Sequence, residues 1–272
     1  MKKLFLFLFL AGICAGAAEL PKRFTVVSGD LKVDVSKESF WNISGARYRG
    51  KIVARPTSWY GTVTAGQSGL KGWIGSGHME NGIGEKNLKV TFKVDGKEWT
   101  PVAGEVSAGC FEIERESDLG HMHLKATVKI SGDTISEHVW TNMNKASMIL
   151  IYHFMYAWNT PYSEYAFRSA DGKVSEGKFA GKKDNLYFPV PEKFGVYSAA
   201  DSVGAVVALK SVAPMGDDAE IRIHDLPYFY KFYFVPTTRA RKKLVPGKTY
   251  EYAAEVKFFS GSREDFINKI TK

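Results

Sequence analysis

The sequence contains only two cysteines in 272 residues, Cys14 and Cys110. We expect Cys14 to leave with an N-terminal targeting segment, so Cys110 would have no partner for an internal disulfide. Cys110 precedes Phe111 in an apolar context, which is typical of a small buried hydrophobic residue. The scarcity of cysteine argues against a disulfide framework and against cysteine-based catalysis.

The sequence also lacks a long hydrophobic run. The apolar run at residues 4–13 is too short to span a bilayer. Lys2 and Lys3 precede it and Ala15-Gly16-Ala17 follows it, which is the pattern of a signal peptide. We predict a signal peptide over residues 1–17, cleavage after Ala17, and an exported protein, periplasmic or extracellular, without stable membrane insertion. The alternative is a lipoprotein anchored at Cys14, although Ile13 stands where a small residue is expected.

Helical periodicity is nearly absent. Short alternating runs separated by Gly, Asp and Asn fill the chain, as in NLKVTFKVDGKEWTPV, where Asp95-Gly96 predicts a hairpin turn. We predict a single all-β domain over residues 18–272, a large antiparallel β-sandwich. The C-terminal segment SREDFINKITK is expected to form a short helix, with Ser262 as its N-cap and Asp265 in its first turn.

Several catalytic signatures are missing as well. There is no nucleophile elbow, no phosphate-binding glycine loop before a helix and no zinc-protease helix. These absences exclude most α/β hydrolases, nucleoside triphosphatases and dehydrogenases.

The charge of the chain is mildly basic. The formal net charge is +8, and it becomes +6 without the two lysines of the targeting segment (8 − 2 = 6). A basic excess favours an anionic partner such as an acidic polysaccharide, unless the charge has no functional meaning. No basic stripe or recognition motif accompanies it, so we expect no nucleic-acid partner.

The segment DLGHMHLKATVKISGDTISEHVWTNMN holds three of the six histidines. A turn at Gly132-Asp133 would pair Ile130 with Ile135 and, further out, Met122 with Met143. Side chains alternate along strands, so one face of this hairpin is predominantly apolar and the other polar and aromatic. The second face would carry His121, His123, Lys125, Thr127, His138, Trp140, Asn142 and Asn144.

We interpret this polar face as a ligand-binding surface. Trp140 would stack on a sugar ring, and histidine, lysine and asparagine would bond to hydroxyl or carboxylate groups. The alternative is an ordinary solvent-exposed side of a sheet. The substrate-binding residues that we predict here are His121, Lys125, His138, Trp140 and Asn142.

A metal site on the same face is a weaker hypothesis. His121 and His123 are spaced to chelate one divalent ion, with His138 or His78 as a third ligand. No Cys or Asp cluster supports this site, so we predict no metal and no other cofactor.

Two further segments carry candidate catalytic groups. The glycine- and aromatic-rich stretch 57–85 contains His78 and Glu80, a pair suited to proton transfer, or it is an ordinary surface excursion. The stretch YHFMYAWNTPYSEY contains the candidate catalytic residues Tyr152 and His153 and a further predicted substrate-binding residue, Trp158. Strict alternation would place Tyr152, Phe154, Tyr156 and Trp158 on one face and Ile151, His153 and Met155 on the other. His224, at the end of IRIHDLP, is expected to be structural or exposed.

Four segments together resemble the galactose mutarotase-like supersandwich, the fold of aldose epimerases and of sandwich domains in many polysaccharide lyases and glycosidases. They are SGARYRGKI, IGSGHMENG, GDTISEHVWTNMNKASMILIYHFMYAWNTP and LVPGKTYEYAAEVKFF. The resemblance covers roughly residues 24–260 and implies a concave sheet face that binds carbohydrate.

The resemblance also implies residue roles. In a mutarotase-like site, His78, His123 or His153 would move protons together with Glu80 or Glu164. In a lyase-like site, Asn142, His123 and Lys125 would bind a uronate, and a tyrosine such as Tyr152 would take part in β-elimination. Three hypotheses remain open: a polysaccharide lyase, a non-catalytic carbohydrate-binding or cell-envelope protein, and an aldose epimerase-like enzyme.

Overall fold

The computed structural model describes residues 20–56, 61–67, 69–76, 84–212, 219–236 and 242–272. The predicted signal peptide and the candidate residues His78 and Glu80 lie outside these residues. Among the described residues, no helix has the length and the apolar character needed to cross a membrane.

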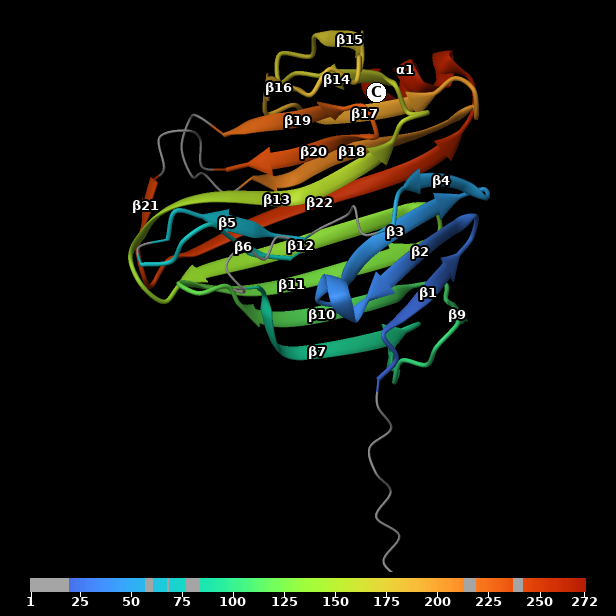
Figure 1. Ribbon diagram of the computed structural model, residues 1–272. Helices are drawn as coiled ribbons and strands as arrows, with labels where there is room; N and C mark the ends of the chain where they lie inside the picture. Colours follow the sequence, from blue (N-terminus) through green and yellow to red (C-terminus); the bar gives the residue numbers. More distant parts are fainter. Residues whose placement is uncertain (1–19, 57–60, 68, 77–83, 213–218, 237–241) are drawn as a thin grey trace, which may run out of the picture.

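Two large β-sheets pack face to face (Figure 1). The first has twelve strands, and β5 (Val63–Ala65), β6 (Trp73–Gly75) and β21 (Lys242–Leu244) join it beside β13. Its main path runs in the order β16 (Asp184–Pro189), β19 (Glu220–Leu226), β20 (Phe229–Val235), β13 (Ser147–Asn159), β4 (Lys51–Ala54), β3 (Asn42–Tyr48), β2 (Leu31–Ser36), β1 (Arg23–Ser28) and β9 (Glu105–Ser107).

The second sheet has ten strands and lies behind the first in Figure 1. Their order is β15 (Val174–Lys178), β14 (Glu164–Arg168), β17 (Lys193–Ser198), β18 (Val203–Val212), β22 (Thr249–Ser260), β12 (Thr134–Met143), β11 (Met122–Ser131), β10 (Phe111–Asp118), β7 (Lys86–Val94) and β8 (Lys97–Glu98). All neighbours in this sheet are antiparallel, whereas β1 and β9 of the first sheet are parallel. The predicted all-β sandwich is confirmed.

The histidine-rich hairpin forms with the predicted register. Ile130 pairs with Ile135, His123 with Asn142 and Met122 with Met143 across β11 and β12. Strict alternation of buried and accessible residues along both strands explains why the pattern could be read from the sequence. The turn at Asp95-Gly96 is also confirmed, with positive φ at both residues between β7 and β8.

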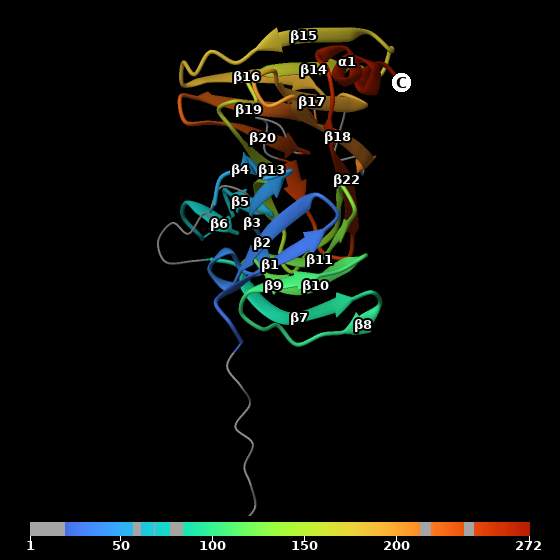
Figure 2. The ribbon, with the colours of Figure 1, turned by 90° about the vertical axis from the view of Figure 1, so that its right-hand side faces the viewer.

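The main core lies between the sheets, which Figure 2 shows side-on. The chain ends in α1 (Arg263–Thr271), which begins with a capping box between Ser262 and Asp265, as its sequence predicts. Phe266 and Ile270 of α1 pack in a smaller cluster with Tyr197 and Phe259 on the outer side of the second sheet. Cys110 was expected to be buried, but it is only half-buried because it lies before β10, where the strand begins.

A bulge in β13 overturns the expected alternation of that strand. Phe154 has φ +52°, and the pairing with β20 shifts between His153 and Tyr156. Phe154 and Tyr156 therefore lie in the core between the sheets, whereas Tyr152 and Met155 lie in a separate cluster. The extra residue separates Tyr152 from the aromatic residues with which simple alternation had grouped it.

A hydrogen-bond network around a buried ion pair of the second sheet joins the two sheets. Arg115 of β10 donates from Nη1 to Glu85 Oε1 at 2.6 Å, and both side chains are essentially inaccessible to solvent. Ser117 Oγ donates to the same carboxylate at 2.7 Å. From the first sheet, Asn42 donates to Ser76 Oγ at 2.9 Å, and the Ser76 hydroxyl in turn donates to Glu85. The pair is compensated by hydrogen bonds, as a buried charge requires.

Replacing Arg115 by Met should lower the free energy of unfolding by about 3–5 kcal/mol, because it leaves the Glu85 carboxylate buried without its cation. Urea denaturation measures the loss, and the double variant R115M/E85Q should recover part of it. Arg49→Met is the matched control, since it breaks an exposed pair with Asp30 and should change stability little. A loss for R115M as small as that for R49M would contradict the bridging role.

Candidate functional site

A cleft of about 370 Å³ opens on the outer face of the first sheet. We call it the Tyr152 cleft. Its aromatic wall consists of Trp73 and Tyr233 on either side of Tyr152, with ring centroids 4.8 Å and 4.9 Å from the Tyr152 ring. The described lining residues are Val63, Trp73, Tyr152, Arg222, His224, Leu226, Phe229, Lys231 and Tyr233.

Strand alternation supplies the cationic wall of the cleft. In β19, Ile221 and Ile223 enter the core, so Arg222 and His224 point to the other side. In β20, Phe232 enters the core and Lys231 lines the cleft, directly across from His224 in the register. Three basic residues thus converge on one hollow.

The Arg222 guanidinium is held by aromatic rings. Its central carbon lies 5.4 Å from the centroid of the Tyr152 ring and 5.0 Å from that of Tyr187. It donates a hydrogen bond to the Tyr152 hydroxyl, and a longer ion pair of 3.7 Å joins it to Glu220. Its Nε is buried and has no hydrogen-bond partner in the part of the chain that the structure describes. The side chain is therefore positioned with a donor still available.

Burial shifts the pKa values of three side chains in the cleft. It lowers the pKa of Lys231 to about 7, since the side chain is almost fully enclosed. Burial also lowers the pKa of His224, and the nearby charges of Lys231 and Arg222 lower it further. Burial raises the pKa of Tyr152, an effect that the Arg222 charge partly opposes. Near neutral pH the cleft therefore combines a permanent cation, an amine close to half-protonation and a protonated phenol.

Of the predicted catalytic residues that the structure describes, only Tyr152 lines this cleft. His153 is fully buried, with its Nδ1 2.8 Å from Thr62 Oγ1, and Trp158 is fully buried in the main core. Glu164 belongs to the second sheet, where it accepts a hydrogen bond of 2.8 Å from Arg263. Ordinary alternation places His153 inward beside the outward Tyr152, and the bulge that follows turns Phe154 inward as well.

The hairpin face that we predicted from the sequence lies on the outer side of the second sheet. We call it the Trp140 face, comprising His123, Lys125, Thr127, His138, Trp140 and Asn142. The His138 and Trp140 rings stack at 3.7 Å, and Lys125 Nζ lies 5.9 Å from the Trp140 centroid. His138 Nε2 is 2.6 Å from Glu251 Oε1. A cavity of about 360 Å³ borders His138 and Trp140.

His121 precedes β11 and is more enclosed than the face itself. Its Nδ1 is 2.5 Å from Ser147 Oγ, and burial lowers its pKa. The described residues contain no group of three or more His, Cys, Asp or Glu side chains placed to hold an ion, and the candidate third ligand His78 lies outside them. The role of the Trp140 face in substrate binding stays a prediction.

The sequence did not predict Arg222, Lys231 and Trp73 as site residues, and His224 was expected to be structural or exposed. One signal was present, because Lys231 interrupts the aromatic run YFYKFYFV and a lone lysine there is a candidate for burial. The cleft itself could not be read from local patterns. Its walls come from β5, β6, β13, β19 and β20, which only the sheet topology brings together.

Comparison with solved structures identifies the fold. A protein from Escherichia coli K12 described as a "Putative aldose 1-epimerase" superposes with a TM-score of 0.52 at 12% identity, over 88% of this chain and 99% of that one. A "putative mutarotase" from Salmonella typhimurium gives a TM-score of 0.54 at 11% identity, over 87% and 90% of the two chains.

A glycosidase shares the architecture over part of its length. The GH36 alpha-galactosidase AgaB from Geobacillus stearothermophilus gives a TM-score of 0.54 at 7% identity, over 89% of this chain and 40% of that one. No protein-family model and no curated protein matches the sequence. The predicted galactose mutarotase-like sandwich is thus confirmed as the fold.

The burial of His153 predicts a specific dependence of stability on pH. Burial lowers the pKa of His153 to about 3 in the folded protein, against about 6.5 in the unfolded chain. The stabilisation is present above pH 6.5 and is lost as the pH falls, because only the unfolded state takes up the proton.

His153→Gln keeps a hydrogen-bonding group toward Thr62 without this titration. Between about pH 6.5 and pH 4, the free energy of unfolding of the wild type should fall by about 3 kcal/mol relative to that of the variant. Denaturation series at both pH values measure the change. A constant difference between the two proteins would show that His153 titrates normally and is accessible to solvent.

Proposed function

We propose that the protein is an exported carbohydrate-active enzyme that binds an acidic sugar chain in the Tyr152 cleft and cleaves it by β-elimination. The observation that carries this proposal is the convergence of Arg222, Lys231 and Tyr152, with an aromatic wall beside them. The carbohydrate-related fold and the predicted signal peptide support the same conclusion.

Binding follows from the two walls of the cleft. The rings of Trp73 and Tyr233 offer apolar surface on which the face of a sugar ring can stack. The Arg222 guanidinium has forked donors that match a carboxylate, and its buried Nε would gain a partner in the complex. A uronate residue satisfies both walls.

The chemistry follows from the protonation states. Arg222 would neutralise the uronate carboxylate, which makes the adjacent C5 proton more acidic. Lys231, with its pKa lowered to about 7, would accept that proton as a neutral amine. The C4–O bond then breaks, and the Tyr152 hydroxyl, which accepts a hydrogen bond from Arg222, would protonate the departing oxygen. The products are an unsaturated uronate and a shortened chain with a new hydroxyl end.

A non-catalytic carbohydrate-binding protein is the second candidate, and the same cations favour it. Among the described lining residues of the cleft there is no carboxylate, which a mutarotase-like mechanism would require. The cleft composition therefore favours elimination or simple binding of an acidic sugar over epimerisation.

Activity is tested with a panel of uronate polysaccharides, by following the ultraviolet absorbance of the unsaturated product. Lys231→Met should lower kcat by about 100-fold or more, as expected for loss of a general base. Arg222→Lys should lower kcat/KM by about 100-fold, because the forked geometry is lost. Arg49→Lys, in an exposed pair with Asp30, is the matched control and should be unchanged. Binding without product on every substrate would refute the lyase and support the binding protein.

The pH profile separates the two candidates independently. If Lys231 is the base, kcat/KM should rise as the pH increases through about 7, since the neutral amine is the active form. If Lys231 only attracts the carboxylate, affinity should fall over the same range, because its charge is lost. Between pH 5 and pH 9, steady-state kinetics should show kcat/KM rising if Lys231 is the base, and equilibrium binding should show affinity falling if Lys231 only attracts the carboxylate. Both quantities should be independent of pH in the K231M variant.

A further inference from the structure

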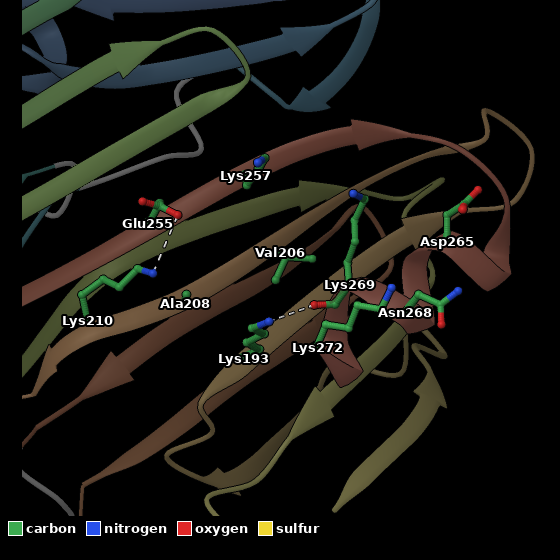
Figure 3. Close-up of a pocket in the computed structure, with 10 residues that line it drawn as sticks. All are labelled: Lys193, Val206, Ala208, Lys210, Glu255, Lys257, Asp265, Asn268, Lys269 and Lys272. Atoms are coloured by element: carbon green, nitrogen blue, oxygen red, sulfur yellow. Dashed lines mark hydrogen bonds and ion pairs between the residues drawn. The ribbon is translucent and has the colours of Figure 1, made fainter. Parts of the chain in front are cut away.

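A second hollow lies on the opposite outer face of the molecule, between α1 and strands β17, β18 and β22 (Figure 3). It has a volume of about 450 Å³, and Val206 and Ala208 of β18 form part of its floor. Five lysines line it, and we call it the lysine pocket: Lys193, Lys210, Lys257, Lys269 and Lys272.

The positive charge of this pocket is poorly compensated. Two acids line it, which leaves a formal excess of three charges (5 − 2 = 3). Asp265 is committed to the N-terminus of α1, where it accepts hydrogen bonds of 2.8 Å from the Ser262 backbone and hydroxyl. Glu255 lies 3.9 Å from Lys210, a long and exposed ion pair. Within the described part of the chain, Lys257, Lys269 and Lys272 form no ion pair with a carboxylate.

Three of the lysines lie near the C-terminal end of α1, where Lys269 Nζ also lies 5.2 Å from the centroid of the Phe259 ring. Lys269 and Lys272 are three residues apart in sequence, which places them on one side of the α1 C-terminus. Lys193 donates to the Lys269 carbonyl at 3.1 Å, and burial together with Arg168 and Lys210 lowers its pKa. Figure 3 shows Lys193, Lys269 and Lys272 close to the helix, and Lys210 and Lys257 further along the strands. Several like charges around one hollow favour the binding of an anion there.

The lysine pocket continues into the Trp140 face. Lys210 and Glu255 line both the lysine pocket and the cavity that borders His138 and Trp140. The stacked His138–Trp140 pair adds an apolar surface for a sugar ring. Four glutamates also line this cavity, so the anionic groups of a bound chain would lie on the lysine pocket; they are Glu112, Glu114, Glu137 and Glu255. An extended chain with repeated anionic groups matches this combination.

We infer that the lysine pocket and the Trp140 face together form a second, non-catalytic binding surface for an anionic polysaccharide, on the opposite side of the sandwich from the Tyr152 cleft. The recognised chemistry is a row of carboxylate or sulfate groups on a sugar backbone. This inference does not depend on cleavage in the cleft, because its residues are separate from those of the cleft.

Equilibrium binding of the full mature chain to polygalacturonate, dextran sulfate and uncharged dextran tests the inference. The triple variant K257Q/K269Q/K272Q should bind both anionic polymers at least about tenfold more weakly and with a shallower dependence on salt, because fewer counterions are released. Lys193 is kept, since it supports the end of α1. The variant K37Q/K97Q/K182Q removes the same charge from exposed positions elsewhere and is the matched control.

Two further measurements make the outcome specific. Trp140→Ala should weaken binding of the polymers but not of free galacturonate. The triple variant should lose the same factor of affinity in an R222K background as in the wild type, because mutations in two independent sites have additive effects on the binding free energy. An equal loss of polymer affinity in the control variant K37Q/K97Q/K182Q would show that only the net charge of the protein matters, and would contradict a specific surface. Tighter binding of the wild type to duplex DNA or to anionic lipid vesicles than to either polymer would overturn the assignment of the partner. Preference for dextran sulfate or for polygalacturonate identifies the anionic group.

Discussion

The buried pair between Glu85 and Arg115 is the interaction on which the arrangement of this sandwich depends. Through its hydrogen bonds it connects β10 of the second sheet to Asn42 and Ser76 on the side of the first sheet. Hydrophobic packing is non-directional, so it would not by itself fix how the two sheets are placed on each other at this point. The Ser76 hydroxyl donates to Glu85, so the same network links the end of β6 to the start of β7.

The bulge at Phe154 decides what the first sheet presents to solvent. Without the extra residue, Tyr152 would share a face with Phe154, Tyr156 and Trp158, which all lie in the core. Before the bulge, the strand contributes Tyr152 to the cleft. At Phe154, where φ is positive, the side of the sheet to which alternate residues point is exchanged, so the aromatic residues after the bulge enter the core. One backbone irregularity, costly for a bulky residue, thereby places the phenol beside Arg222.

How much of this could be predicted from the sequence depends on the range of the contacts. The β11–β12 hairpin was predicted to the residue, because a two-residue turn and strict alternation fix its register locally. The fold class and the capping box of α1 were equally accessible. The Tyr152 cleft was not, since Val63, Tyr152 and Tyr233 approach only through the strand order of the first sheet. The burial of His153 was not predicted because the sequence did not show which face of β13 points inward, and nothing in YHFMYAWN announces the bulge that turns Phe154 inward as well.

The two proposed surfaces cannot serve one short ligand at the same time. Packed sheets are about 10 Å apart, and side chains on both outer faces add to this thickness, so a chain seated in the lysine pocket must pass around an edge of the sandwich to reach the Tyr152 cleft. The second surface is therefore suited to holding the protein on a polymer while the cleft samples other segments or neighbouring chains. Such tethering raises the effective concentration of sugar at the cleft without any added contact there. A basic sandwich with a cationic hollow on each face has the charge distribution that this mode of action requires.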